Sequence, residues 1–122
     1  MSSPLRSAII VGTAVFAVHL ALAVALFISV HMSGGGQAGF AWFWFMRIDY
    51  PISNLAWEHI ATSRPLEALM NWGYTWGDGP NIRALFIHGL IGGLQWFILG
   101  AIAGFLFWPR SGYIATWRRR EV

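Results

Sequence analysis

The chain has 122 residues, a formal net charge of +3 and no cysteine, and 57% of its residues are hydrophobic while only 11% are charged. Soluble domains carry about 25% charged residues, so this composition indicates one membrane-embedded unit covering residues 1–122. The absence of cysteine excludes disulfides, iron–sulfur clusters, thiolate metal sites and cysteine nucleophiles.

The first long apolar segment covers about residues 8–30 and carries no formal charge. At a rise of 1.5 Å per residue it reaches about 35 Å, enough for a hydrocarbon core of about 30 Å. The segment is longer than the apolar region of a cleaved signal peptide, and no small-x-small cleavage site follows it. We therefore expect a retained transmembrane helix.

The connection, residues 31–81, begins with the flexible stretch "SGGGQAG" and is rich in aromatic residues. Its apolar run at 40–46 is too short to span, and its Trp and Phe residues favour the headgroup level. Two short helices are expected after it, the second beginning at Pro65 and ending before Gly73. We expect interfacial helices that rest on the membrane as an aromatic belt or dock on another protein.

The second long apolar segment covers about residues 82–108. Its entry is marked by "GDGPN", in which Pro80 suits the first turn of a helix. A basic tail, residues 109–122, follows the span and contains "WRRR". We interpret these arginines as a topology signal and not as a nucleic-acid site.

The distribution of arginine predicts the orientation. Arg6 and the arginines of the tail flank the spans, whereas the two arginines of the connection are outnumbered by four carboxylates. The positive-inside rule places both termini in the cytoplasm of a bacterial-type inner (plasma) membrane. The predicted fold class is an all-α membrane protein, a two-transmembrane-helix hairpin with an extracytoplasmic, aromatic-rich connection.

Small residues mark one face of each predicted span. Such faces let helix backbones approach closely in lipid, where no hydrophobic force drives helices together. We expect the hairpin to pack through Ala17, Ala21 and Ala25 of the first helix and Gly89, Gly93, Gly100 and Gly104 of the second.

His19, His88 and Gln95 are polar side chains within the predicted spans. His88 and Gln95 are one heptad apart and share a face, and Gln95 is close to mid-span. A buried amide without a partner is costly, so Gln95 needs one. His19 is a candidate, but it lies about 200° from Ala17 around the helix, away from the small face. We therefore expect a partner protein, docked through Gln95 with Trp42 and Trp44 of the connection.

The pattern Ala84, His88, Gly92 resembles the pigment site of bacterial antenna polypeptides, in which a small residue precedes the liganding histidine by one turn. The resemblance covers nine residues and implies (bacterio)chlorophyll binding through His88. Haem is the other cofactor that His88, or His19, could ligate, although a depth difference of about 8 Å disfavours one haem bridging both. Structural hydrogen bonding and proton handling are the alternatives for His88.

The remaining sequence carries no catalytic set. No HExxH metal motif, phosphate-binding loop or aligned acidic stripe is present, and no small-molecule substrate is indicated. We expect a non-enzymatic accessory or assembly subunit that docks on a larger membrane complex. The alternative is a pigment- or haem-binding subunit of a photosynthetic or respiratory complex.

Overall fold

The computed structural model describes residues 3–34 and 36–118, and every regular element in these ranges is a helix. This confirms the all-helical prediction. Two stretches, Pro4–Met32 and Gly79–Phe107, are long and apolar enough to cross a membrane. In chain order the elements are α1 (Pro4–Met32), the 3₁₀ helix η1 (Gly36–Ala41), α2 (Trp42–Ile48), α3 (Ile52–His59), α4 (Arg64–Tyr74), α5 (Gly79–Leu85), the π-helical η2 (Phe86–Gly92) and α6 (Gly93–Arg118).

Helix α1 begins and ends at residues suited to those positions. The Ser3 hydroxyl accepts a hydrogen bond from the backbone N–H of Arg6 at 3.2 Å, which caps the first turn. Pro4 stands in that turn, where the missing N–H has no helical partner in any case. After the helix, Gly34 adopts a φ of +76°, a conformation that suits glycine because it has no Cβ.

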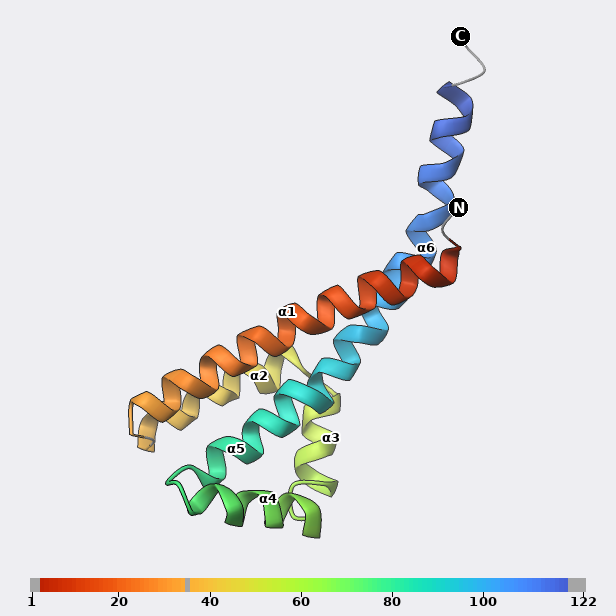
Figure 1. Ribbon diagram of the computed structural model, residues 1–122. Coiled ribbons are helices and arrows are strands. Elements are labelled where there is room, and N and C mark those ends of the chain that lie inside the picture. Colours follow the sequence, from red (N-terminus) through yellow and green to blue (C-terminus); the bar gives the residue numbers. More distant parts are fainter. Residues whose placement is uncertain (1–2, 35, 119–122) are drawn as a thin grey trace.

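The segments α5, η2 and α6 follow one another without a break and run antiparallel beside α1 (Figure 1). Hydrogen bonds join the two long helices at both ends and in the middle: Ser7 Oγ donates to the Gly104 carbonyl at 3.0 Å, His19 Nε2 to the His88 carbonyl at 2.9 Å, and Asn81 Nδ2 to the Phe27 carbonyl at 3.0 Å. The pairing fixes the register of the two helices over most of their length.

Helices α2 and α3 are joined by a sharp turn, with α2 running along α1 and α3 turning away beside η2 (Figure 1). We call α2, this turn and α3 the α2–α3 hairpin. Trp42 and Phe45 of α2 pack against Ala23 and Val30 of α1 in one apolar cluster. The turn at 49–51 lies beside the middle of α1. The connection therefore reaches halfway along the long helices.

Helix α4 lies below α5 in Figure 1 and runs from the end of α3 back to the start of α5. Leu66 of α4 packs with Ala56 of α3 and Ile87 of η2 in a second apolar cluster. Helices α4 and α5 approach closely, because a Cβ on Gly73 would lie 2.9 Å from the Cα of Gly79. Gly73 is inside α4, one residue before its end, and not after it as the sequence suggested.

The placement of residues 40–46 and the end of α6 differ from the sequence-based expectation. Residues 40–46 belong to η1 and α2, which pack on α1 and do not form a separate surface piece. The physical reason is that Trp42 and Phe45 find apolar partners on α1 and α5. Helix α6 also continues past Pro109 to Arg118. The rest of the basic tail, residues 119–122, lies outside the described residues.

Candidate functional site

The turn between α2 and α3 places Asp49, whose side chain is 0% exposed, among three N–H donors. His19 Nε2 lies 3.2 Å from Oδ1, and His88 Nδ1 lies 3.2 Å from Oδ2. Trp96 Nε1 donates to Oδ1 at 3.0 Å. A carboxylate that receives three donors acts only as an acceptor, which matches its ionised form. We call Asp49, His19, His88 and Trp96 the Asp49 cluster.

Both ring nitrogens of His88 are engaged. Nδ1–H donates to Asp49, and Nε2 accepts from Trp57 Nε1 at 3.1 Å, so these contacts assign the neutral tautomer protonated at Nδ1. The ring is 0% exposed and stacks on Trp42 with centroids 5.5 Å apart. A pigment or haem at His88 therefore requires one of these bonds to break, and cofactor binding there stays a prediction.

His19 joins the two long helices at mid-length. Its Nε2 lies 2.9 Å from the carbonyl oxygen of His88, as well as beside Asp49, so one N–H is shared between two acceptors. The His88 carbonyl belongs to η2, whose wider π-helical turn departs from the α-helical bonding pattern. His19 thus connects α1 to the turn between α2 and α3 and to the second long helix.

Gln95 finds both of its partners within the chain. Nε2 donates to the Tyr50 carbonyl at 3.2 Å, and Oε1 accepts from the Ile52 N–H at 3.4 Å. The expectation that Gln95 lacks an internal partner is therefore wrong. Its partners are backbone groups of the connection, which the sequence did not place at this depth. Gln95 on its own gives no reason for an external partner.

Gly92 makes room for the carboxylate. A Cβ at this position would overlap the Asp49 side chain, with Cγ only 2.6 Å away. In the pattern that resembles an antenna pigment site, Gly92 therefore lies where the hairpin tip approaches the second long helix. Ala84, the other small residue of the pattern, packs in the apolar cluster with Trp42.

The glycines predicted for helix packing on the second long helix all face α1. A Cβ on Gly104 would lie 2.7 Å from the Ser7 carbonyl oxygen, and one on Gly100 would lie 3.1 Å from the Cα of Gly12. At Gly89 and Gly93 an added Cβ would meet the side chains of Leu20 and Phe16. Close backbone approach therefore joins α1 and α6.

The face predicted for α1 is wrong. Ala17, Ala21 and Ala25 are exposed on the far side of the helix. The buried residues of α1 are Ala8, Gly12, His19, Ala23 and Val30. The inward face of α1 is set by two residues. Gly12 lets α6 approach closely, and His19 contacts Asp49.

A second polar cluster lies near the end of α1. Asn81 Oδ1 accepts from Trp42 Nε1 at 2.8 Å, while Asn81 Nδ2 donates to Asp78 Oδ2 at 3.0 Å. The same Asp78 oxygen lies 2.7 Å from His31 Nδ1. These contacts tie η1–α2, the start of α5 and the last turn of α1 to one another.

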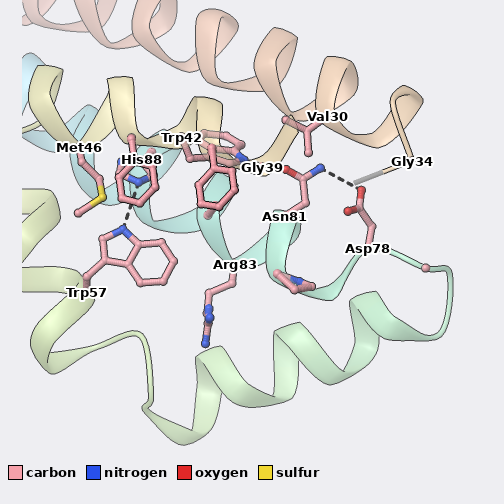
Figure 2. Close-up of a pocket in the computed structure, with 15 residues that line it drawn as sticks. Val30, Gly34, Gly39, Trp42, Met46, Trp57, Asp78, Asn81, Arg83 and His88 are labelled. Carbon is pink, nitrogen blue, oxygen red and sulfur yellow. Dashed lines mark hydrogen bonds between the residues drawn. The ribbon is translucent and has the colours of Figure 1, made fainter. Parts of the chain in front are cut away.

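A groove of about 750 Å³ lies between these two clusters. Figure 2 shows its lining residues Trp57, Met46, Trp42, His88 and Asn81, and the Arg83 side chain, which leaves α5 on the side of α4. The Arg83 guanidinium lies 5.2 Å from the centre of the Trp57 ring. Its Nε is enclosed and has no hydrogen-bond partner among the described residues.

The outward side of the hairpin presents other residues. Trp44 is 69% exposed and Tyr50 is 65% exposed, and Arg47 between them is exposed as well. Trp42, which the sequence grouped with Trp44 for docking, is only 6% exposed and belongs to the interior. Of the predicted docking residues, Trp44 is exposed, Gln95 is half-buried and Trp42 is buried.

The Asp49 cluster can fix the positions of the helices around it and bury the Asp49 carboxylate. Among the described residues, no group of three or more His, Cys, Asp or Glu side chains is placed to hold a metal ion. The N–H donors of the Asp49 cluster are engaged by the Asp49 carboxylate and by the His88 carbonyl, which leaves no donor of this group free for a substrate. The accessible chemistry lies in the groove and on the outward side of the hairpin.

Sequence reasoning missed Asp49, Trp57, Arg83 and Trp96. Asp49 lies outside both apolar segments, and only the fold brings it to their middle. The available signal was the stretch "RIDYP", in which a carboxylate follows an aromatic run and precedes a turn proline. No family model, curated protein or solved structure matches this chain.

Proposed function

We propose that this chain is a small integral-membrane accessory or assembly subunit, structural in role, that docks on a larger membrane protein complex. In this proposal α1 and Gly79–Phe107 cross the membrane as a hairpin, with both termini in the cytoplasm. Each is 29 residues long, about 43 Å at the α-helical rise, against a core of about 30 Å. The α2–α3 hairpin enters from the extracytoplasmic side and turns back inside the membrane.

The observation that carries the proposal is an exposed arginine deep along the spans. Arg47 is exposed and lies two residues before Asp49, which contacts His19 at the middle of α1. Met32 ends α1 about 20 Å from His19 along the helix axis. Arg47 therefore lies well below the outer surface in the proposed orientation.

An arginine facing lipid at that depth is unfavourable by about 2.5–3.5 kcal/mol on insertion scales. Among the described residues no carboxylate lies within ion-pair distance of Arg47. Tyr50 and Asn54 line the same shallow hollow, and Tyr50 exposes a hydroxyl group there. A partner helix that carries a carboxylate and a hydrogen-bond acceptor satisfies all three. We call Trp44, Arg47, Tyr50 and Asn54 the docking face.

The test is co-purification from the native membrane in mild detergent, followed by native mass measurement. Losing one partner of a buried interfacial charge pair costs about 2 kcal/mol or more, so Arg47→Gln should lower the retained partner roughly 30-fold. Arg64→Gln is the matched control, because Arg64 is exposed at the start of α4. A wild-type chain that migrates alone, without a stable partner, contradicts the proposal.

The proposed topology has a separate test, which uses the absence of native cysteine. Thr62 is exposed between α3 and α4, so Thr62→Cys should react with an impermeant thiol reagent in intact cells. Ser3→Cys and Ser111→Cys should stay unlabelled until the membrane is opened. Labelling at either of these two positions in intact cells refutes the orientation.

A further inference from the structure

We infer that the groove beside Arg83 is a binding site for a phospholipid with an anionic headgroup, with the phosphate on Arg83 and one acyl chain along the aromatic wall. The site rests on the membrane topology proposed above, but not on the docking face. A different set of residues carries it.

Arg83 is the unpaired charge of the groove. Its guanidinium lies over the Trp57 ring but makes no ion pair with the residues that the structure describes, and its enclosed Nε lacks an acceptor. Asp78 also lines the groove, but it is already engaged by His31 and Asn81. The groove therefore presents a cation that its own carboxylate does not neutralise. Guanidinium groups bind phosphate through paired N–H donors.

The rest of the groove suits a hydrocarbon chain. Its lining is mainly apolar and includes Phe40, Phe43, Met46 and Trp57 (Figure 2). His88 is at the deep end, but it is buried and both of its nitrogens are engaged, so it offers the ligand no hydrogen bond. The volume of about 750 Å³ falls within the range of about 300–1,000 Å³ found for sites of drug-sized ligands.

The order of these features along α5 gives the ligand a direction. Arg83 is in the first turns of α5, near the end of the molecule that the proposed topology places outside. His88 lies about 7.5 Å deeper along the same helix. A lipid of the outer leaflet has this polarity, with its phosphate near the surface and its chains below. A soluble anion carries no hydrocarbon chain that could fill the apolar part of the groove.

The experiment uses the full chain purified in detergent, with phosphatidylglycerol and phosphatidylcholine that carry the same fluorescent acyl chain. The wild type should bind phosphatidylglycerol roughly tenfold more tightly, the scale of one charged hydrogen bond. Arg83→Gln should remove this preference. Arg64→Gln makes the same change in net charge outside the groove and should retain it. Equal binding by the wild type and Arg83→Gln overturns the inference.

A second variant tests the apolar part of the site. Gly39 lines the groove, and a Cβ added there meets no atom within 4 Å, so Gly39→Phe should fill space without disturbing the fold. It should weaken binding of both lipids, whereas unchanged binding of both overturns the placement of the chain. Inorganic phosphate alone should not displace the lipid, and full displacement by millimolar phosphate would identify a soluble anion as the ligand. A wild-type chain that shows no lipid preference but co-purifies with a partner complex rejects this site alone. A wild-type chain that shows the preference but migrates without a partner rejects only the docking proposal.

Discussion

The two halves of this molecule are held together by different means. Between the N-terminus of α1 and the middle of α6, two helices pack through glycine, and the Ser7–Gly104 contact is a hydrogen bond to the backbone. From His19 onward, α2 and α3 join the two long helices, and side-chain hydrogen bonds converge on Asp49 and Asn81. The half that holds the polar network therefore has three layers, namely α1, the second long helix and the α2–α3 hairpin, whereas the other half has only the two long helices.

The difference follows from what each arrangement can enclose. Two helices in lipid have no interior that excludes the bilayer from a polar side chain, so they gain most from close backbone approach. Adding the α2–α3 hairpin creates an interior in which Asp49 and His88 are both 0% exposed. Buried polar groups are tolerated when each has its partners. The α2–α3 hairpin is therefore the element that allows a charge to be buried at the middle of the long helices.

The strongest way to break the three-layer half is to remove its acceptor. Asp49→Leu leaves the N–H groups of His88 and Trp96 without the partner they have in the structure. Breaking such a buried set should lower the free energy of unfolding by about 3–5 kcal/mol. Unfolding in mixed detergent micelles measures it, with Glu67→Gln as an exposed control. Unchanged stability of Asp49→Leu would show that the cluster does not hold the hairpin.

The two-helix half is tested by Gly104→Ala. The new Cβ would lie 2.7 Å from the Ser7 carbonyl oxygen, so α1 and α6 must separate, which costs about 1–3 kcal/mol. Hydrogen exchange should increase in α6 and at the start of α1, while α2 and α3 stay protected. Ala17→Leu is the control: it changes the exposed side of α1 and should alter stability by less than about 0.5 kcal/mol. The reverse order of effects would favour the packing face that the sequence suggested.

The smallest effect is expected at the boundary between the halves. Gln95→Leu removes two hydrogen bonds to the hairpin turn, one of which is long at 3.4 Å. Interhelical hydrogen bonds in membranes are worth about 0.6–2 kcal/mol, so a loss near 1 kcal/mol is expected with insertion unaffected. A loss as large as that of Asp49→Leu would mean that Gln95 also holds a group outside this chain.

Much of the secondary structure was predictable because it depends on local chemistry. Uncharged apolar runs and Pro80 predict the two long helices, apart from the extension of α6 past Pro109, and the glycine-rich stretch that includes Gly34 follows the first of them. The glycines of α6 were predictable as a packing face, since a small face in lipid has few other uses. Helix α4 followed from Pro65 in its first turn.

Tertiary structure alone decided the site. The same apolar pattern around Phe45 suits a surface piece or a packed helix, and only the complementary faces of α1 and α5 select the packed one. The face of α1 was chosen by His19, whose partner Asp49 is remote in sequence, and Gly92 is needed because the Asp49 carboxylate comes to rest against it. Periodicity identifies which residues share a helix face, but it does not identify what that face meets, because hydrogen bonds and steric fit depend on atoms that only folding brings together.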